Sequence, residues 1–264
     1  MPNSRRPRRA RKHPLPNPSG VHFLTARHVV DDLIRSCSPS SGDLVLDLGA
    51  GTAAITAPLA ATGARVLAVE RDPEFARRLR ARLGAADNVR VIQADARTFP
   101  LPDKEFLVVS SIPYGIATAL LRRLLGPRTT RLRRAALVVE WGFAKRVTEP
   151  LPRSTELAWW AARFDIQLLR KVPAHCFRPS PSVNSAQLLL RRRPGATPRG
   201  ERLLWALLRA ARRQPTRSAR STVTALAGKG THRLLRRHGI DPAMPTAGVR
   251  PPSWAALAEE LAVR

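Results

Sequence analysis

The sequence predicts an α/β protein in which a doubly wound, mostly parallel sheet with an antiparallel edge is followed by a small helical domain. Three observations support this fold class. Short apolar runs typical of buried strands alternate with stretches of helical periodicity over residues 42–190. Two strand candidates then follow one another with no helix between them, which indicates an antiparallel pair at the edge of the sheet. Beyond a break at residues 191–195, only helical patterns remain.

The first half of the series begins with a helix. Apolar residues recur at helical spacing over residues 29–37, and the segment 39–42, with its Pro, Ser and Gly, ends that helix. Four short apolar runs then follow, each ending at a polar or glycine-rich turn as buried parallel strands do: residues 44–46, 66–69, 89–93 and 106–109. Between the first and second runs lies a helical stretch that ends near Thr62. A second helical stretch, residues 74–83, lies between the second and third runs.

The second half continues the alternation and then becomes helical. The patterns predict a helix at 116–125, a strand at 135–139 and a helix that covers at least 143–147. The two adjacent strands are expected at 166–169 and 186–190. The helices expected after the break are residues 203–211, 222–226, 232–238 and 254–263. We therefore expect a basic flexible arm (1–20), a domain that contains the sheet (21–193) and a basic helical domain (194–264).

Composition excludes several classes of protein. With 264 residues and 44% hydrophobic side chains, the chain can bury a core, so wholesale disorder is excluded. The sequence contains no run of 18 apolar residues, the length needed to span a membrane. Its basic N-terminal segment lacks the apolar part of a signal peptide. Two cysteines with no metal-ligand spacing provide neither a disulfide framework nor a zinc site. We expect a soluble, cytoplasmic protein without a metal.

The charge of the chain indicates a polyanionic partner. The net charge is +27, and it is concentrated at the ends: residues 1–12 carry +6, residues 13–190 carry +9 and residues 191–264 carry +12. Arginine-rich compositional drift is the alternative, but drift alone would spread the excess evenly. Lys and Arg displace condensed counterions from phosphate backbones, so we expect nucleic-acid binding that weakens steeply with salt.

A glycine turn follows the first strand candidate. The pattern Asp47-x-Gly49-x-Gly51 leads from a strand into a helix, where glycines let the backbone approach a ligand. Glu70 ends the next strand, and a carboxylate there can accept hydrogen bonds from both ribose hydroxyls of a nucleoside. A dinucleotide, S-adenosylmethionine (SAM) and a purely structural turn all remain open at this point.

Two further strand ends favour SAM. Asp95-Ala96 ends the third strand, where a carboxylate or backbone group can bind an adenine amino group. Ser111-Ile112-Pro113-Tyr114 ends the fourth, where acceptors can orient the lone pair of an exocyclic amine and the tyrosine ring can stack on a base. Taken alone, this tetrapeptide could be an ordinary strand exit, but hydride transfer has no evident use for it.

Together these motifs resemble those of the rRNA adenine N6-methyltransferases, specifically the Erm-type 23S rRNA enzymes of macrolide resistance. The resemblance covers residues 17–190 well and the helical tail loosely. The strand-end motifs match the family in order and spacing, and residues 20–24 resemble its S/G-Q-N-F-L motif. The longest matches are residues 140–146, EWGFAKR against E-Y-G-F-A-K-R, and residues 177–185, FRPSPSVNS against F-x-P-x-P-K-V-N-S.

The resemblance implies a Rossmann-like SAM methyltransferase, acting as a monomer on one adenine in the peptidyl-transferase loop of 23S rRNA, in domain V. It implies that Tyr114 and Phe177 sandwich the target adenine, with Ser111, Ile112 and Pro113 completing the catalytic segment. The cofactor-binding residues that it implies are His22, Leu24, Gly49, Gly51, Glu70, Asp95, Ala96 and Ser111. Two alternatives stay open: a small-subunit rRNA adenine dimethyltransferase, and a non-catalytic RNA-binding or assembly factor that retains the fold.

The sequence departs from the family pattern at three places. Ser111 stands where the family has Asn, and a hydroxyl is a shorter and less directional acceptor than a carboxamide. Val21 and His22 replace the expected Gln and Asn, and Ser182 replaces a Lys that would contact phosphate. Ser110 could share the acceptor role, although the register before Ile112 favours Ser111.

Three other features carry less specific signals. His175-Cys176 lacks an orienting group and is interpreted as structural. Trp159-Trp160 are better explained as core and partial surface than as a platform for a base. The run 191–193 is either a solvated linker or an RNA contact.

Overall fold

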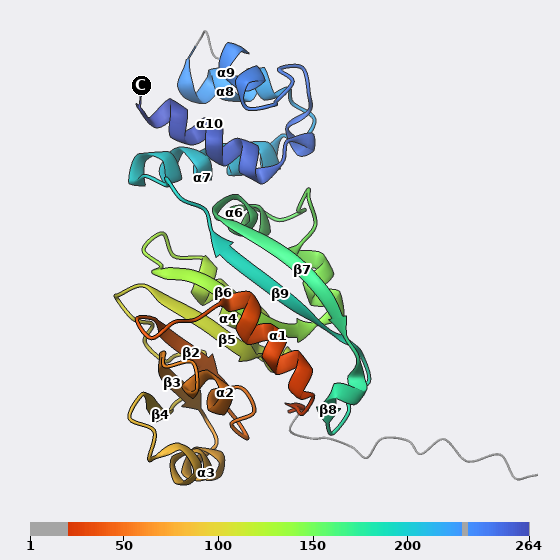
Figure 1. Ribbon diagram of the computed structural model, residues 1–264. Helices are drawn as coiled ribbons and strands as arrows, with labels where there is room; N and C mark the ends of the chain where they lie inside the picture. Colours follow the sequence, from red (N-terminus) through yellow and green to blue (C-terminus); the bar gives the residue numbers. More distant parts are fainter. Residues whose placement is uncertain (1–20, 229–231, 264) are drawn as a thin grey trace, which may run out of the picture.

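The computed structural model describes residues 21–228 and 232–263, and the predicted basic arm at residues 1–20 lies outside them (Figure 1). A seven-stranded sheet has the order β4-β3-β2-β5-β6-β9-β7. The parallel strands are β2 (Leu44–Leu48), β3 (Arg65–Glu70), β4 (Val89–Gln93), β5 (Phe106–Ser111) and β6 (Leu132–Glu140). The antiparallel edge consists of β9 (Ser185–Arg192) and β7 (Phe164–Val172). The predicted fold class is confirmed.

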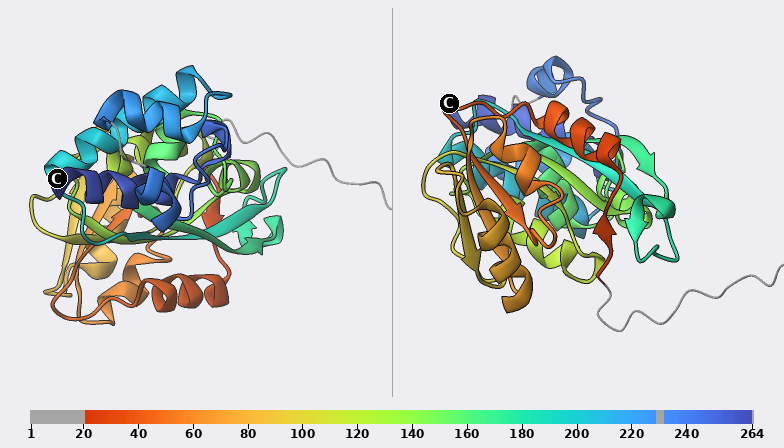
Figure 2. Two further views of the ribbon diagram at one scale, coloured as in Figure 1. Left: turned by 90° about the horizontal axis from the view of Figure 1, so that it is seen from above. Right: turned by 60° about the horizontal axis from the view of Figure 1, so that its bottom comes forward.

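Helices cover both faces of this sheet, as the left view of Figure 2 shows. On one face, α1 (Arg27–Cys37), α2 (Thr56–Ala60) and α3 (Pro73–Leu83) pack on alternate strand residues such as Val66 and Ala68. On the other face, α4 (Ala117–Leu125), α5 (Trp141–Val147) and α6 (Thr155–Arg163) pack on the intervening residues such as Val69 and Leu137. Because side chains alternate across a strand, a run buried on both faces needs apolar residues at nearly every position.

The C-terminal part is helical, as expected. It contains α7 (Pro198–Arg213), α8 (Ala219–Ala227), α9 (His232–Arg237), η3 (Thr246–Gly248) and α10 (Pro251–Val263). Thr197 caps the N-terminus of α7, because its hydroxyl accepts from the Gly200 amide, and Pro198 occupies the first turn. Buried residues of α7 and α10 share one apolar cluster with Trp159 and Trp160 of α6. The helical part therefore packs directly on the sheet part.

Several elements differ from the sequence expectation. The helix expected up to Thr62 shortens to α2, because Ala53 lies in the left-handed region with φ of 67° and extends the glycine turn. The strand β7 is longer than 166–169, because it runs directly out of α6 and pairs along the whole of β9. The two-stranded sheet of β1 (Phe23–Leu24) and β8 (Phe177–Arg178), with the short turns η1 (Tyr114–Ile116) and η2 (Ala174–Cys176), has no local signal in the sequence.

Candidate active site

A pocket of about 620 Å³ opens at the carboxyl ends of β2, β3, β4 and β5. Parallel strands place their carboxyl ends at one edge of a sheet, which is where ligands bind in open α/β folds. The structure brings all of the predicted cofactor-binding residues to this pocket: His22, Leu24, Gly49, Gly51, Glu70, Asp95, Ala96 and Ser111. Among the catalytic residues, Pro113 also lines it.

The glycine turn and Glu70 form one hydrogen-bonded unit. The Gly51 amide donates to Glu70 Oε2 at 2.9 Å, and the Asp72 amide donates to Glu70 Oε1 at 2.8 Å. Gly51 has φ of 49°, and a Cβ there would lie 3.0 Å from the ring of Phe23. Two backbone amides therefore fix the carboxylate, and each of its oxygens retains acceptor capacity towards the pocket.

Asp95 lies in the pocket wall but is not a free carboxylate. Arg97 forms an ion pair with it at 2.6 Å, and the Arg97 backbone amide also donates to it at 2.8 Å. These hydrogen bonds from Arg97 lower the pKa of Asp95 to about 2. Arg97 also lines the pocket, but no motif of the sequence singled it out.

Asp47 is the buried acid of the pocket, and its side chain is 1% exposed. Burial raises the pKa of Asp47 to about 7, with the nearby charge of Glu70 adding to the effect. The Thr56 hydroxyl donates to Asp47 Oδ2 at 2.7 Å and opposes the shift. The sequence motif contained Asp47, but its burial could not be read from the motif.

The two serines at the end of β5 have different environments. Ser110 is fully buried, and its hydroxyl donates to the Leu48 carbonyl at 2.7 Å. Ser111 is partly exposed and lines the pocket. Of the two, Ser111 is therefore the one that can meet a ligand, as its register suggested. Ile112 is 2% exposed, so its side chain belongs to the core.

Tyr114 lies half-buried beside the pocket. Its hydroxyl is 2.7 Å from Ser185 Oγ, and burial raises the pKa of the phenol. The His22 ring lies 5.8 Å from the Tyr114 ring, centroid to centroid, and His22 Nδ1 is 2.7 Å from the carbonyl oxygen of Pro179. Ser185 was part of a recognised motif, but its contact with the tyrosine depends on β9 reaching this end of the sheet.

The ring of Phe177 does not face an open space beside Tyr114 in which an adenine could be sandwiched. Phe177 is 1% exposed and packs in the apolar cluster with Leu24 and Val172, because β8 pairs with β1 in a register that sets Leu24 opposite Phe177. Almost none of this ring is therefore open to a base in the structure. The sandwich role of Phe177 therefore stays a prediction, and His22 is the ring next to Tyr114 in this structure.

Residues 21–228 and 232–263 contain neither a candidate metal site nor a candidate membrane span. No group of three His, Cys, Asp or Glu side chains is placed to hold a metal ion in these ranges. In the same part of the chain, no helix has the length and apolar character needed to cross a membrane.

Comparisons with known proteins agree with this geometry. Residues 17–263 match the model of the family described as ribosomal RNA adenine dimethylase. The chain is 33% identical over 181 residues to an rRNA adenine N-6-methyltransferase of Bacillus licheniformis, an alignment that spans 69% of this chain and 63% of the relative. It is 33% identical over 244 residues to the mycinamicin-resistance protein MyrB of Micromonospora griseorubida, covering 90% and 76% of the two chains. It is also 31% identical over 260 residues to ribosomal RNA small subunit methyltransferase A of Anaeromyxobacter dehalogenans, covering 90% of each.

A solved structure gives the same result for the fold. The 23S rRNA methyltransferase ErmE superposes with a TM-score of 0.76 at 25% identity, over 90% of this chain and 99% of that chain. The family match also confirms, at the level of the family, the prediction of SAM as cofactor. The assignment of individual residues to that cofactor stays a prediction.

Proposed function

This chain belongs to the ribosomal RNA adenine dimethylase family, and we propose that it methylates N6 of one adenine in the peptidyl-transferase loop of 23S rRNA. Such a modification would protect the ribosome from macrolide-type antibiotics. The observation that carries the proposal is the convergence of Ser111, Pro113 and the cofactor-binding residues on one pocket, with Tyr114 beside it. The division into a methyltransferase domain (21–193) and an RNA-binding domain (194–264) is part of the proposal.

The pocket suits SAM in size and in chemistry. Its volume of about 620 Å³ falls within the usual range for cofactor sites. Glu70, fixed by two backbone amides, would accept hydrogen bonds from the ribose hydroxyls, and Asp95 would accept from the adenine amino group. The glycine turn lets the backbone approach the ligand closely. When bound, SAM supplies an electrophilic methyl group.

The residues at the mouth of the pocket would orient the target amine. Ser111 Oγ can accept one of the two N–H groups of the adenine amine, which leaves the lone pair directed at the methyl group. Tyr114 would stack on the base, and its hydrogen bond to Ser185 fixes the ring. No separate general base is required, because the methylated amine can lose its proton to water. Extrusion of the base costs a few kcal/mol, which stacking and phosphate contacts offset.

Both ribosomal subunits supply candidate targets. The EWGFAKR segment, which forms Glu140 and most of α5, together with the similarity to MyrB and to ErmE, favours 23S rRNA and a resistance role. The similarity to a small subunit methyltransferase over 90% of both chains supports the second candidate, an adenine dimethyltransferase of the small subunit.

One experiment separates these candidates. The protein is incubated with labelled SAM and with naked 23S rRNA, naked 16S rRNA or whole ribosomes, and methylated positions are mapped by primer extension. We expect primer extension to map the methylation to a single adenine in domain V of 23S rRNA. Label confined to 16S rRNA would support the small-subunit enzyme. No label in any substrate would support a non-catalytic RNA-binding factor, provided that the protein still binds SAM.

A further inference from the structure

A second pocket lies at the corner between the α4–β6 loop, α6 and α7, away from the cofactor pocket. It has a volume of about 260 Å³, and its walls combine aromatic and charged side chains: Gly126, Arg128, Glu156, Trp159, Trp160 and Trp205. We refer to it as the tryptophan corner. Three of the five tryptophans of the chain line this one small pocket, although they come from two different helices.

The aromatic side chains of the corner are held in a defined arrangement. Trp159 is 4% exposed, and its Nε1 donates to the Gly126 carbonyl at 2.9 Å. Its ring meets the Trp205 ring edge to face, with centroids 5.4 Å apart. Trp205 is half-buried and so presents part of its ring to the outside. Trp160 is 1% exposed, and its Nε1 is buried without a hydrogen-bond partner in the described part of the chain. Buried N–H groups are nearly always paired, so this unpaired group in a residue that lines the pocket is unusual.

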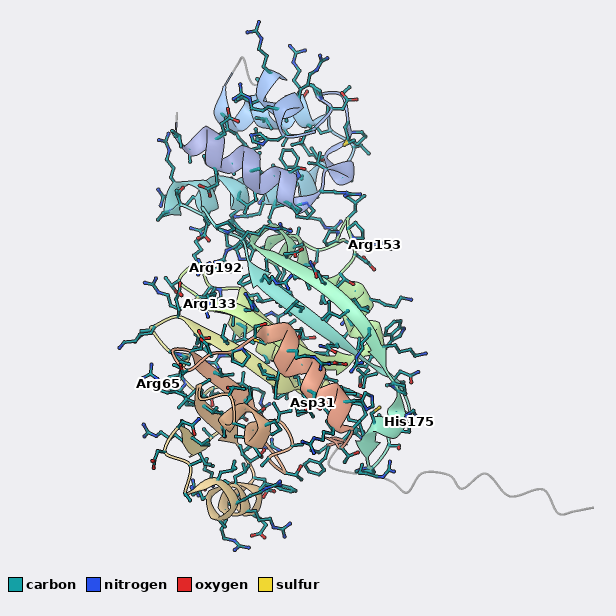
Figure 3. The ribbon with its side chains drawn as sticks, in the orientation of Figure 1. Asp31, Arg65, Arg133, Arg153, His175 and Arg192 are labelled. Atoms are coloured by element: carbon teal, nitrogen blue, oxygen red, sulfur yellow. The ribbon has the colours of Figure 1, made fainter. Side chains whose placement is uncertain are left out.

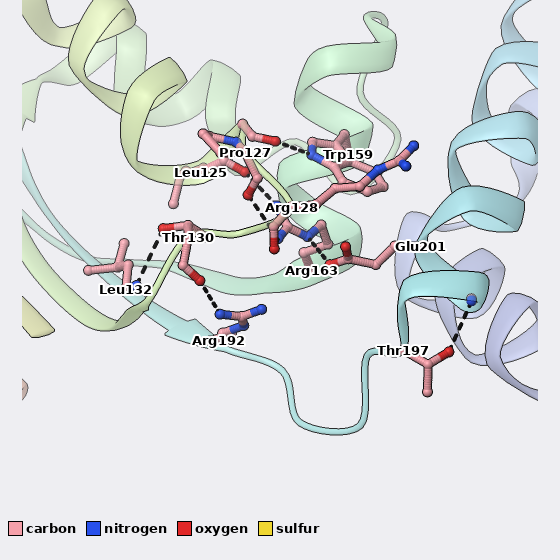
Figure 4. A network of polar contacts seen from close by, with 12 residues as sticks. Leu125, Pro127, Arg128, Thr130, Leu132, Trp159, Arg163, Arg192, Thr197 and Glu201 are labelled. Carbon is pink, nitrogen blue, oxygen red and sulfur yellow. Dashed lines mark hydrogen bonds and ion pairs between the residues drawn. The ribbon is translucent and has the colours of Figure 1, made fainter. Parts of the chain in front are cut away.

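One arginine of the corner has a charge that no described carboxylate neutralises, and it lies beside the Arg163–Glu201 pair that Figure 4 shows. Arg163 pairs with the buried Glu201, and Glu156 is engaged by Arg122. Among residues 21–228 and 232–263, Arg128 has no ion-pair partner, and its guanidinium lies 5.9 Å from the centroid of the Trp159 ring. An Arg192 guanidinium nitrogen donates to the Thr130 carbonyl, two residues beyond Arg128. Arg128 is exposed, and a guanidinium without a carboxylate partner can bind an anion. Phosphate suits arginine in particular.

The corner is remote from the cofactor pocket. The strand β9 starts at Ser185, which contacts Tyr114, and ends at Arg192 beside the corner. Seven residues of extended chain separate the two sites by roughly 20 Å. Figure 3 shows Arg133 and Arg192 on the side of the sheet away from His175, which belongs to the turn before β8. A ligand at the corner is therefore not the target adenine.

We propose that the tryptophan corner binds one unstacked nucleotide of the RNA, with the base against Trp205 and the phosphate on Arg128. Aromatic stacking and a neighbouring cation are the two elements by which proteins hold single-stranded RNA. This inference rests on the proposed function in one respect, namely that the bound polymer is RNA. A partner protein is the competing occupant, and the test below separates the two.

The test measures the dissociation constant of a short, labelled single-stranded RNA by fluorescence anisotropy. We expect Trp205→Ala to weaken binding roughly 5- to 100-fold, the range for the loss of one stacked base, and Trp205→Phe to retain most of the affinity. Arg128→Ala should weaken binding and reduce the salt slope by about 1, whereas Arg90→Ala, an exposed arginine of β4, serves as the matched control. A thiouridine in the RNA should crosslink to the peptide that contains Trp205.

The variants must first show an unchanged circular dichroism spectrum and unchanged SAM affinity. Wild-type affinity of a folded Trp205→Ala for RNA, or crosslinks confined to the cofactor-pocket side, would overturn the proposal and favour a protein partner. Methylation of rRNA is measured separately. If no rRNA is methylated while RNA binding still depends on Trp205, the proposed methylation is refuted and RNA binding at the tryptophan corner is supported.

Discussion

The buried Asp47 carboxylate makes the stability of this protein depend on pH in an unusual direction. Most carboxylates in proteins are ionised and stabilised in the native state, so stability is lost as the pH falls. Asp47 is 1% exposed, and burial raises its pKa from the ordinary value of 3.8 to about 7. Between these two values the native state binds more protons than the unfolded chain. We therefore expect the contribution of Asp47 to the free energy of unfolding to fall as the pH rises through this window, and to stay constant above it.

The magnitude follows from the two pKa values. A shift of about 3 units corresponds to about 4 kcal/mol at full ionisation. Of this, about 3 kcal/mol would be lost between about pH 5 and about pH 8.5, because part of the effect has already occurred by pH 5. Asp47→Asn cannot ionise, and its side-chain oxygen can still accept from the Thr56 hydroxyl. As the pH rises over the same range, the free energy of unfolding of the variant should increase relative to that of the wild type by about 3 kcal/mol.

The assay is urea unfolding of both proteins near pH 5, pH 7 and pH 8.5, with the same slope m required of each. The difference between wild type and Asp47→Asn isolates the contribution of Asp47 from that of every group the two proteins share. Asp87→Asn makes the same substitution at an exposed position and is the control for the effect of the substitution itself. If the difference between wild type and Asp47→Asn were independent of pH, then Asp47 would be ionised throughout and the reasoning from burial would be wrong.

Three further predictions concern the catalytic segment and the domain junction. In methyl transfer to a 23S domain V fragment, Ser111→Ala should lower turnover and Ser111→Asn should retain or raise it, and equal rates for all three would exclude the acceptor role. Tyr114→Ala should cost several kcal/mol of transition-state stabilisation and Tyr114→Phe much less, whereas wild-type kinetics of the alanine variant would exclude stacking. Arg163→Met leaves Glu201 buried and unpaired and should reduce the free energy of unfolding by about 3–5 kcal/mol. The exposed pair of Arg122 with Glu156 is the comparison, and Arg122→Met should cost much less than Arg163→Met in the same urea titration.

The cofactor pocket could be predicted from sequence because its parts are local. Each of Glu70, Asp95 and Ser111 lies at or directly after the end of an apolar run, and parallel strands bring such ends to one edge without further information. His22 and Leu24 came only from the resemblance. They reach the pocket because β1 pairs with β8, more than 150 residues away in the sequence. No local pattern specifies such a pairing.

The same long-range pairing explains why the expectation for Phe177 could not be settled from sequence. A motif fixes the residue type and its spacing, but not which side of a two-stranded ribbon faces the core. The register that sets Leu24 opposite Phe177 buries both side chains and leaves His22 next to Tyr114. Whether the ribbon opens when RNA binds depends on the cost of exposing two apolar side chains, about 1.5–3 kcal/mol each.

Charge shows the limit of sequence reasoning most clearly. A net charge of +27 indicates a polyanionic partner but does not say which arginines meet it. Arg77 and Arg78 both pair with Glu74 within α3, a neutralisation that helical spacing predicts. Arg163 is neutralised by Glu201, 38 residues later and in a different part of the fold, and this leaves Arg128 without an ion-pair partner among the described residues. The arginines that remain available to RNA are therefore defined by the tertiary positions of the few carboxylates, which is why the tryptophan corner becomes visible only in the folded protein.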